Sequence, residues 1–87
     1  MVDVSAAAEA ELLEFVENAL TAAAGLRICD AFDSVCEDLR SFPELGPVEA
    51  DGETRALHRA QLRWVYEVAD SGVRLLHIVN PRRERSN

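Results

Sequence analysis

The chain of 87 residues contains no lysine, and all nine of its basic residues are arginines. No apolar run approaches the ~18 residues that a membrane-spanning helix needs, so we expect no membrane partner. The N-terminus lacks the basic segment of a signal peptide, and we therefore expect a cytoplasmic protein. Cys29 and Cys36 form no C-x-x-C pair and have no histidine near them in sequence. We accordingly expect no metal site and no cofactor.

The charges are divided unevenly along the chain. Residues 1–53 contain thirteen acidic residues and two arginines, whereas residues 54–87 contain seven arginines and three acidic residues. The local charges are −11 and +4, and their total of −7 disfavours general affinity for nucleic acid. We interpret the acidic half as a solubilising surface. A site is expected in the basic half, because arginine presents a planar fork suited to phosphate and carboxylate.

The length predicts a single domain over residues 1–87. Near its start, Val2 and Val4 alternate with Asp3, which suits a short edge strand. Ser5 then offers an N-cap for a following helix.

Two helices are expected next. Residues 6–24 are rich in Ala, Leu and Glu and predict a first helix, with Gly25 as its C-cap or hinge. Residues 26–42 carry an apolar stripe at helical spacing and predict a second helix, which Pro43 ends. The two should form an antiparallel hairpin. Residues 41–53 contain two prolines and two glycines and predict an acidic loop.

The remaining chain changes from helical to strand-like spacing. Three strands are expected, at residues 54–60, 62–68 and 73–79, with a tight turn of Asp70, Ser71 and Gly72 between the last two. Residues 80–87 are expected to form a basic tail. The predicted fold class is therefore α+β: a short N-terminal strand and an antiparallel helix hairpin packed on a three- to four-stranded antiparallel sheet.

The register of the last two strands decides which side chains share a face. A three-residue turn pairs Val65 with His77 and places Arg63 and His77 on one face. The core would then contain Trp64, Tyr66, Leu76 and Ile78. A two-residue turn reverses this association, and the sequence leaves both registers open. We interpret the tryptophan and the tyrosine as core aromatics in either case.

The arginines of the basic half are the candidate functional residues. The orientation of His58 and Arg59 is open, because their strand is poorly defined. Arg82 and Arg83 follow Pro81, either as a solvated tail or, together with Arg63, as part of an anion-binding groove. Such a surface could stabilise charge on a phosphate during transfer, or dock an acidic partner. No P-loop, nucleophile elbow, GxGxxG or HExxH motif is present.

Four stretches, in this order along a chain of this length, resemble the RelE/ParE toxin superfamily of bacterial toxin–antitoxin modules. VDVSAAAEAELLEFVE is similar to the family's opening strand and first helix, and LRSFPELG to the end of its second helix. RWVYEVADSGVRLLHIV is similar to its terminal hairpin, and PRRERS to its closing basic segment.

The resemblance implies a toxin that inhibits growth, with a cognate antitoxin as its partner. In the RelE-like branch, the toxin enters the ribosomal A site and cuts mRNA, and the 2′-hydroxyl attacks the adjacent phosphate. The positions that match this branch are Arg63 and Arg83, which the resemblance implies to be catalytic. We add as candidate substrate-binding residues Arg55, His58, Arg59, His77 and Arg82.

Two differences from the RelE-like branch keep alternatives open. That branch has lysines on the strand before Arg63 and an aromatic residue at its end, whereas this chain has no lysine and no aromatic residue after Tyr66. The ParE-like branch has the same fold without the ribonuclease residues and inhibits DNA gyrase. A degenerate member that only binds an antitoxin is the third possibility.

Overall fold

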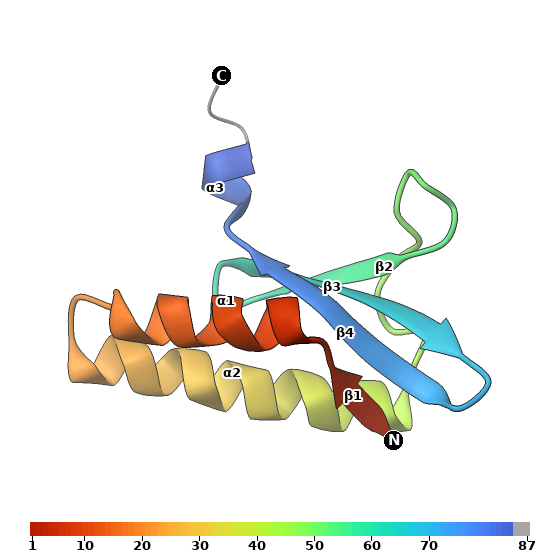
Figure 1. Ribbon diagram of the computed structural model, residues 1–87, viewed down its shortest axis with the longest axis horizontal. Helices are drawn as coiled ribbons and strands as arrows, with labels where there is room; N and C mark the ends of the chain where they lie inside the picture. The colour runs from red at the N-terminus through yellow and green to blue at the C-terminus, as the bar shows by residue number, and fades with distance from the viewer. Residues whose placement is uncertain (85–87) are drawn as a thin grey trace.

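A four-stranded sheet and two long helices make up most of the chain (Figure 1). The computed structural model describes residues 1–84, apart from the side chains of Arg83 and Glu84. The element order is β1 (Val2–Val4), α1 (Ala6–Glu17), α2 (Ala22–Ser41), β2 (Arg55–Arg59), β3 (Leu62–Ala69), β4 (Gly72–Val79) and α3 (Pro81–Glu84). The α+β class and the order of strand, two helices and three strands are confirmed.

The sheet is mixed rather than antiparallel throughout. Its strand order is β1-β4-β3-β2, and β1 runs parallel to β4 with Val2 opposite Val73 and Val4 opposite Leu75. The all-antiparallel prediction was therefore wrong at this edge. A parallel pair needs a long crossover connection, and here the helices and two further strands supply it. The backbone N–H of Ser5 continues the ladder by donating to Leu75 O at 2.9 Å.

The break between the helices lies earlier than the sequence predicted. Helix α1 ends at Glu17, and α2 begins after Thr21, whose Oγ1 accepts a hydrogen bond from Ala24 N at 3.0 Å. Gly25 is not the hinge but a buried residue inside α2, where an added Cβ would lie 3.6 Å from Val16 O. The capping hydroxyl therefore outweighs the high helix propensity of the surrounding alanines.

The β3–β4 hairpin combines features of both predicted registers. Ala69 pairs with Gly72, so the turn itself has two residues, yet Val65 pairs with His77 further along. The register shifts because β4 holds one extra residue opposite the stretch between Val65 and Tyr66 of β3. Such a bulge reverses the alternation of faces along one strand. Arg63 and His77 consequently share a face, as the three-residue alternative predicted.

The core lies between the helices and one face of the sheet, which we call the inner face. Trp64 and Tyr66 are fully buried there, as predicted, and so is Leu75. Leu75 takes the core position predicted for Leu76, because Leu76 is the extra residue of the bulge between Leu75 and His77. Helix α2 contributes Ala31, Val35 and Leu39 to the same cluster.

Polar groups at the edge of this core are paired. Trp64 Nε1 donates to Arg59 O at 2.9 Å, and Tyr66 Oη accepts from Gly46 N at 2.8 Å. The second bond anchors the loop of residues 42–54 to the sheet. Where a basic tail was expected after β4, residues Pro81–Glu84 form a single helical turn (Figure 1).

Within residues 1–84, no helix combines the length and the apolar character needed to cross a membrane.

Candidate functional site

The face of the sheet away from α1 and α2, which we call the outer face, carries the candidate residues. Along β3, Leu62, Trp64 and Tyr66 are buried on the inner face, so Arg63 and Val65 project from the outer face. His58 on β2 lies directly opposite Arg63 in the register, and the bulge turns His77 of β4 outward as well. Side chains directly opposite each other in an antiparallel pair have Cβ atoms about 4.5–5.5 Å apart.

A hollow of about 320 Å³, which we call the outer hollow, opens on this face. It is lined by the side chains of two strands and the preceding loop: Glu49, Ala50, Asp51, Thr54, Arg63, Val65, His77 and Val79. The structure therefore brings together two residues that the sequence singled out, Arg63 and His77. It also adds two carboxylates that sequence reasoning assigned only to an acidic loop.

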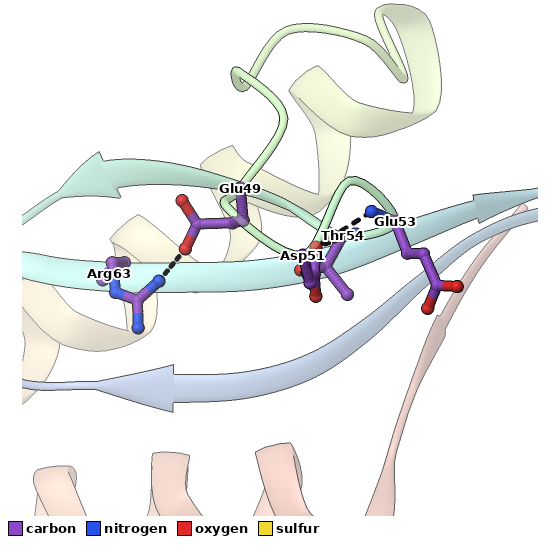
Figure 2. A network of polar contacts seen from close by, with 5 residues as sticks. All are labelled: Glu49, Asp51, Glu53, Thr54 and Arg63. Atoms are coloured by element: carbon purple, nitrogen blue, oxygen red, sulfur yellow. Dashed lines mark hydrogen bonds and ion pairs between the residues drawn. The ribbon is translucent and has the colours of Figure 1, made fainter.

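Glu49 brings a carboxylate from the acidic loop into direct contact with Arg63. Its Oε1 accepts a hydrogen bond from Arg63 Nη1 in a close ion pair (Figure 2). The two side chains are only 31% and 23% exposed, respectively. Partial burial reduces solvent screening, so this charge-assisted bond is stronger than a typical exposed ion pair. The site thus contains a guanidinium with a carboxylate held against it.

Local chemistry explains why the loop folds back onto the sheet. Asp51 Oδ1 accepts hydrogen bonds from the backbone N–H groups of Glu53 and Thr54, each at 2.9 Å, and Oδ2 accepts from Thr54 Oγ1 at 2.8 Å (Figure 2). These bonds, the one from Thr54 N foremost, lower the pKa of Asp51 because they stabilise its ionised form. Glu49 N in turn donates to Thr54 O at 2.7 Å. The D-G-E-T stretch is an Asx-turn signal that could have indicated this reversal.

Helix α1 contacts His77 through the side chain of Glu11. His77 Nδ1 lies 3.3 Å from Glu11 Oε2, while Glu11 Oε1 accepts a hydrogen bond from Ile78 N at 2.9 Å. The imidazole remains 54% exposed and lines the outer hollow. The sequence placed Glu11 only within the first predicted helix, residues 6–24.

Arg55 and Arg59 are not part of the outer hollow. Their register opposite Tyr66 and Leu62 places them on the inner side of the sheet. Arg59 Nη1 binds Asp38 Oδ2 at 2.7 Å, and Arg55 Nη1 donates to Gly46 O at 2.8 Å. Both arginines therefore connect β2 to the helix and loop of the acidic half.

Arg82, which follows β4, does not line the outer hollow. Arg82 is exposed and lines a separate small hollow beside Asn80 and Gln61, and its backbone N–H donates to Asn80 Oδ1 at 3.0 Å. The backbone of Arg83 is part of α3, and its side chain lies outside the described part of the structure. Among the described residues, no group of three or more histidine, cysteine, aspartate or glutamate side chains is arranged to hold a metal ion.

A further hollow, which is mainly apolar, lies where α2 meets the loop of residues 42–54. Its volume is about 730 Å³, and its most exposed apolar residues are Phe42, Leu45 and Val68, at 65%, 48% and 45%. An exposed apolar surface of this kind is typical of a contact with another protein.

The fold and the site together define a small α+β protein with an arginine, a carboxylate and a histidine on the open face of its sheet. The profiles of known protein families do not match this chain, and neither does any curated protein.

Proposed function

We propose that this protein is a RelE-like toxin of a toxin–antitoxin module and inhibits translation by cutting ribosome-bound mRNA. The observation that carries the proposal is the convergence of Arg63, Glu49 and His77 on the outer hollow. Cleavage through the 2′-hydroxyl needs a base, an acid and a group that stabilises charge on the phosphate. One residue of each kind is present at this face. Cognate antitoxin, ribosome and mRNA are the partners that the proposal requires.

Each residue has a defined part in the proposed reaction. The Glu49 carboxylate takes the proton of the 2′-hydroxyl while the 2′-oxygen forms its bond to phosphorus. Arg63 donates hydrogen bonds to the non-bridging oxygens, on which negative charge builds up. His77 gives a proton to the departing 5′-oxygen as the bond between phosphorus and that oxygen breaks. The products are a 2′,3′-cyclic phosphate and a free 5′-hydroxyl.

The topology suits an attack in line with the leaving group. Strand β3 lies between β4 and β2, and the loop carrying Glu49 runs along the far edge of β2, where Val48 bridges to Arg55. Glu49 and His77 therefore approach Arg63 from opposite sides. A base and an acid on opposite sides of the phosphate are the arrangement that in-line displacement requires.

The test is to induce the protein in growing cells and map the 5′ ends of mRNA. We expect new 5′-hydroxyl ends in translated regions, and we expect Arg63→Ala to reduce their rate of formation by about 10²–10³-fold. Arg74→Ala is the matched control, because Arg74 is an exposed arginine of β4 that does not line the outer hollow. Equal cleavage by both variants would contradict the assignment of Arg63.

Gyrase inhibition of the ParE-like kind is the second candidate, and one observation favours it. Arg55 and Arg59 lie on the inner side of the sheet, so the outward basic residue of β2 is His58, which lacks the permanent charge of an arginine. The outer hollow therefore holds fewer permanent positive charges than the sequence suggested. This candidate predicts that purified protein stalls gyrase in cleaved complexes with DNA. Normal supercoiling in excess protein would exclude it.

A member that only binds an antitoxin would cause no growth arrest on induction. Growth arrest without new mRNA ends and without gyrase inhibition would exclude both activities proposed above.

A further inference from the structure

The carboxylate of Glu11 connects helix α1 to two neighbouring residues of β4. It projects from α1, accepts the backbone N–H of Ile78 with one oxygen, and contacts His77 Nδ1 with the other. Strand β1 covers β4 only over Val73–Leu75, so beyond this stretch the backbone edge of β4 needs another partner. Glu11 supplies that partner and is thereby fixed in position.

A fixed carboxylate determines the protonation pattern of the histidine next to it. An ionised carboxylate only accepts hydrogen bonds, so the Nδ1 that faces Glu11 must carry a proton. In the neutral imidazole the second nitrogen, Nε2, is then unprotonated. Because the ring also lines the outer hollow, Nε2 is the nitrogen available to that hollow. Any proton that His77 gives to or takes from the hollow therefore moves at Nε2.

We propose that Glu11 is a positioning residue that holds His77 in the Nδ1–H tautomer, with Nε2 serving the outer hollow. The consequence for cleavage rests on the proposed function, since His77 is there the proton donor to the 5′-oxygen. Glu11 also stabilises the imidazolium that must exist before that transfer, as carboxylates next to catalytic histidines do. The acidic helix thus contributes to the site as well as to solubility.

Glu11→Gln separates this role from a purely structural one. The amide oxygen of glutamine still accepts the N–H of Ile78, so the edge of β4 stays paired. Its NH₂ group faces Nδ1 and donates to it, which requires an unprotonated Nδ1 and moves the proton of the neutral ring to Nε2. Glu11→Ala removes both contacts. Glu14→Gln is the matched control, because Glu14 is an exposed residue of the same helix.

The first measurement uses the free protein and needs no substrate. Ring ¹⁵N shifts are recorded by NMR at pH 9, where an ordinary imidazole is neutral, with His58 as an internal reference and His77→Asn for assignment. We expect the Nδ1–H tautomer of His77 in the wild type and in Glu14→Gln, and the Nε2–H tautomer in Glu11→Gln. An unchanged tautomer in Glu11→Gln would overturn the proposal.

The second measurement is cleavage of ribosome-bound mRNA. We expect Glu11→Gln to lower kcat by about 10–100-fold with little change in KM, since supporting hydrogen-bond partners typically have effects of this size. A changed tautomer with unchanged kcat would refute the role in cleavage and leave the proposed function intact. If the wild type cuts no mRNA, the proposed function fails, and the NMR result alone decides the tautomer.

Discussion

Removing the hydroxyl of Tyr66 should destabilise the protein far more than the loss of one hydrogen bond suggests. Tyr66 is fully buried, and its Oη accepts from Gly46 N at 2.8 Å. Gly46 is also buried, and a Cβ added there would lie 2.5 Å from Ala56 O, so the backbone is already closely packed. In Tyr66→Phe the Gly46 N–H loses this acceptor at a buried position.

The size of the effect follows from this arrangement. A buried donor left without an acceptor costs about 1–3 kcal/mol, and the close packing around Gly46 favours about 2 kcal/mol. For a domain of this size, 1 kcal/mol shifts Tm by roughly 4–8 °C, so Tm should fall by roughly 8–16 °C. Urea unfolding followed by circular dichroism gives the free energy, and calorimetry gives Tm.

The control is Ser34→Ala. It also removes a hydroxyl that takes part in a hydrogen bond, the one to Arg59 Nη1 at 2.8 Å, but at an exposed position. Its free energy of unfolding should stay within about 0.5 kcal/mol of the wild type. If Tyr66→Phe is equally mild, the loop of residues 42–54 is not anchored as we describe, and the placement of Glu49 loses its support.

Three further predictions concern other parts of the molecule. Ala60 and Gln61 both have positive φ, at 54° and 62°, in the β2–β3 turn, so the double variant Ala60→Asn, Gln61→Gly should raise the free energy of unfolding by about 1 kcal/mol or more. The pKa of Asp51 is lowered by its hydrogen bonds, so its ionised form stabilises the fold above the pKa of the unfolded chain. The stability difference between wild type and Asp51→Ala should be complete at neutral pH and disappear as pH falls through that lowered pKa; a difference independent of pH would contradict this. Burial, and to a lesser degree Asp33, raises the pKa of the Cys36 thiol, so iodoacetamide at pH 8 should alkylate it more slowly than glutathione in the same tube.

Local sequence patterns predicted the strands well, because alternating β-branched and aromatic residues next to a D-S-G turn leave few other structures. The pairing of β1 with β4 could not be predicted from such patterns, since Val2 and Val73 are far apart in the chain. The helix boundary was missed for a local reason. Thr21 as an N-cap was overlooked within an alanine-rich stretch whose propensity favours one continuous helix.

The site was half predicted, and the missing half comes from the acidic segment. The shared face of Arg63 and His77 depends on a bulge in β4 that no turn signal marks. Glu49 and Glu11 come from a loop and a helix, and only the tertiary fold brings them to the sheet.

The uneven charge distribution has a structural explanation that composition alone does not give. The three arginine ion pairs between described residues, Arg55–Glu44, Arg59–Asp38 and Arg63–Glu49, and the contact of His77 with Glu11 each join a base of residues 54–87 to an acid of residues 1–53. The acidic half therefore supplies the partners of the basic half. The more exposed pairs among them contribute only about 0–1 kcal/mol each, so their main effect is to orient the side chains, whereas the partly buried Arg63–Glu49 pair is stronger.

The most direct test of the central claim is single-turnover cleavage of mRNA on purified ribosomes, comparing the wild type with Glu49→Gln and Arg74→Ala. We expect Glu49→Gln, which removes the proposed base from the outer hollow, to slow cleavage by about 10²–10⁴-fold, while Arg74→Ala cuts at the wild-type rate. Cleavage by Glu49→Gln at the wild-type rate, or no cleavage by any of the three proteins, would contradict it.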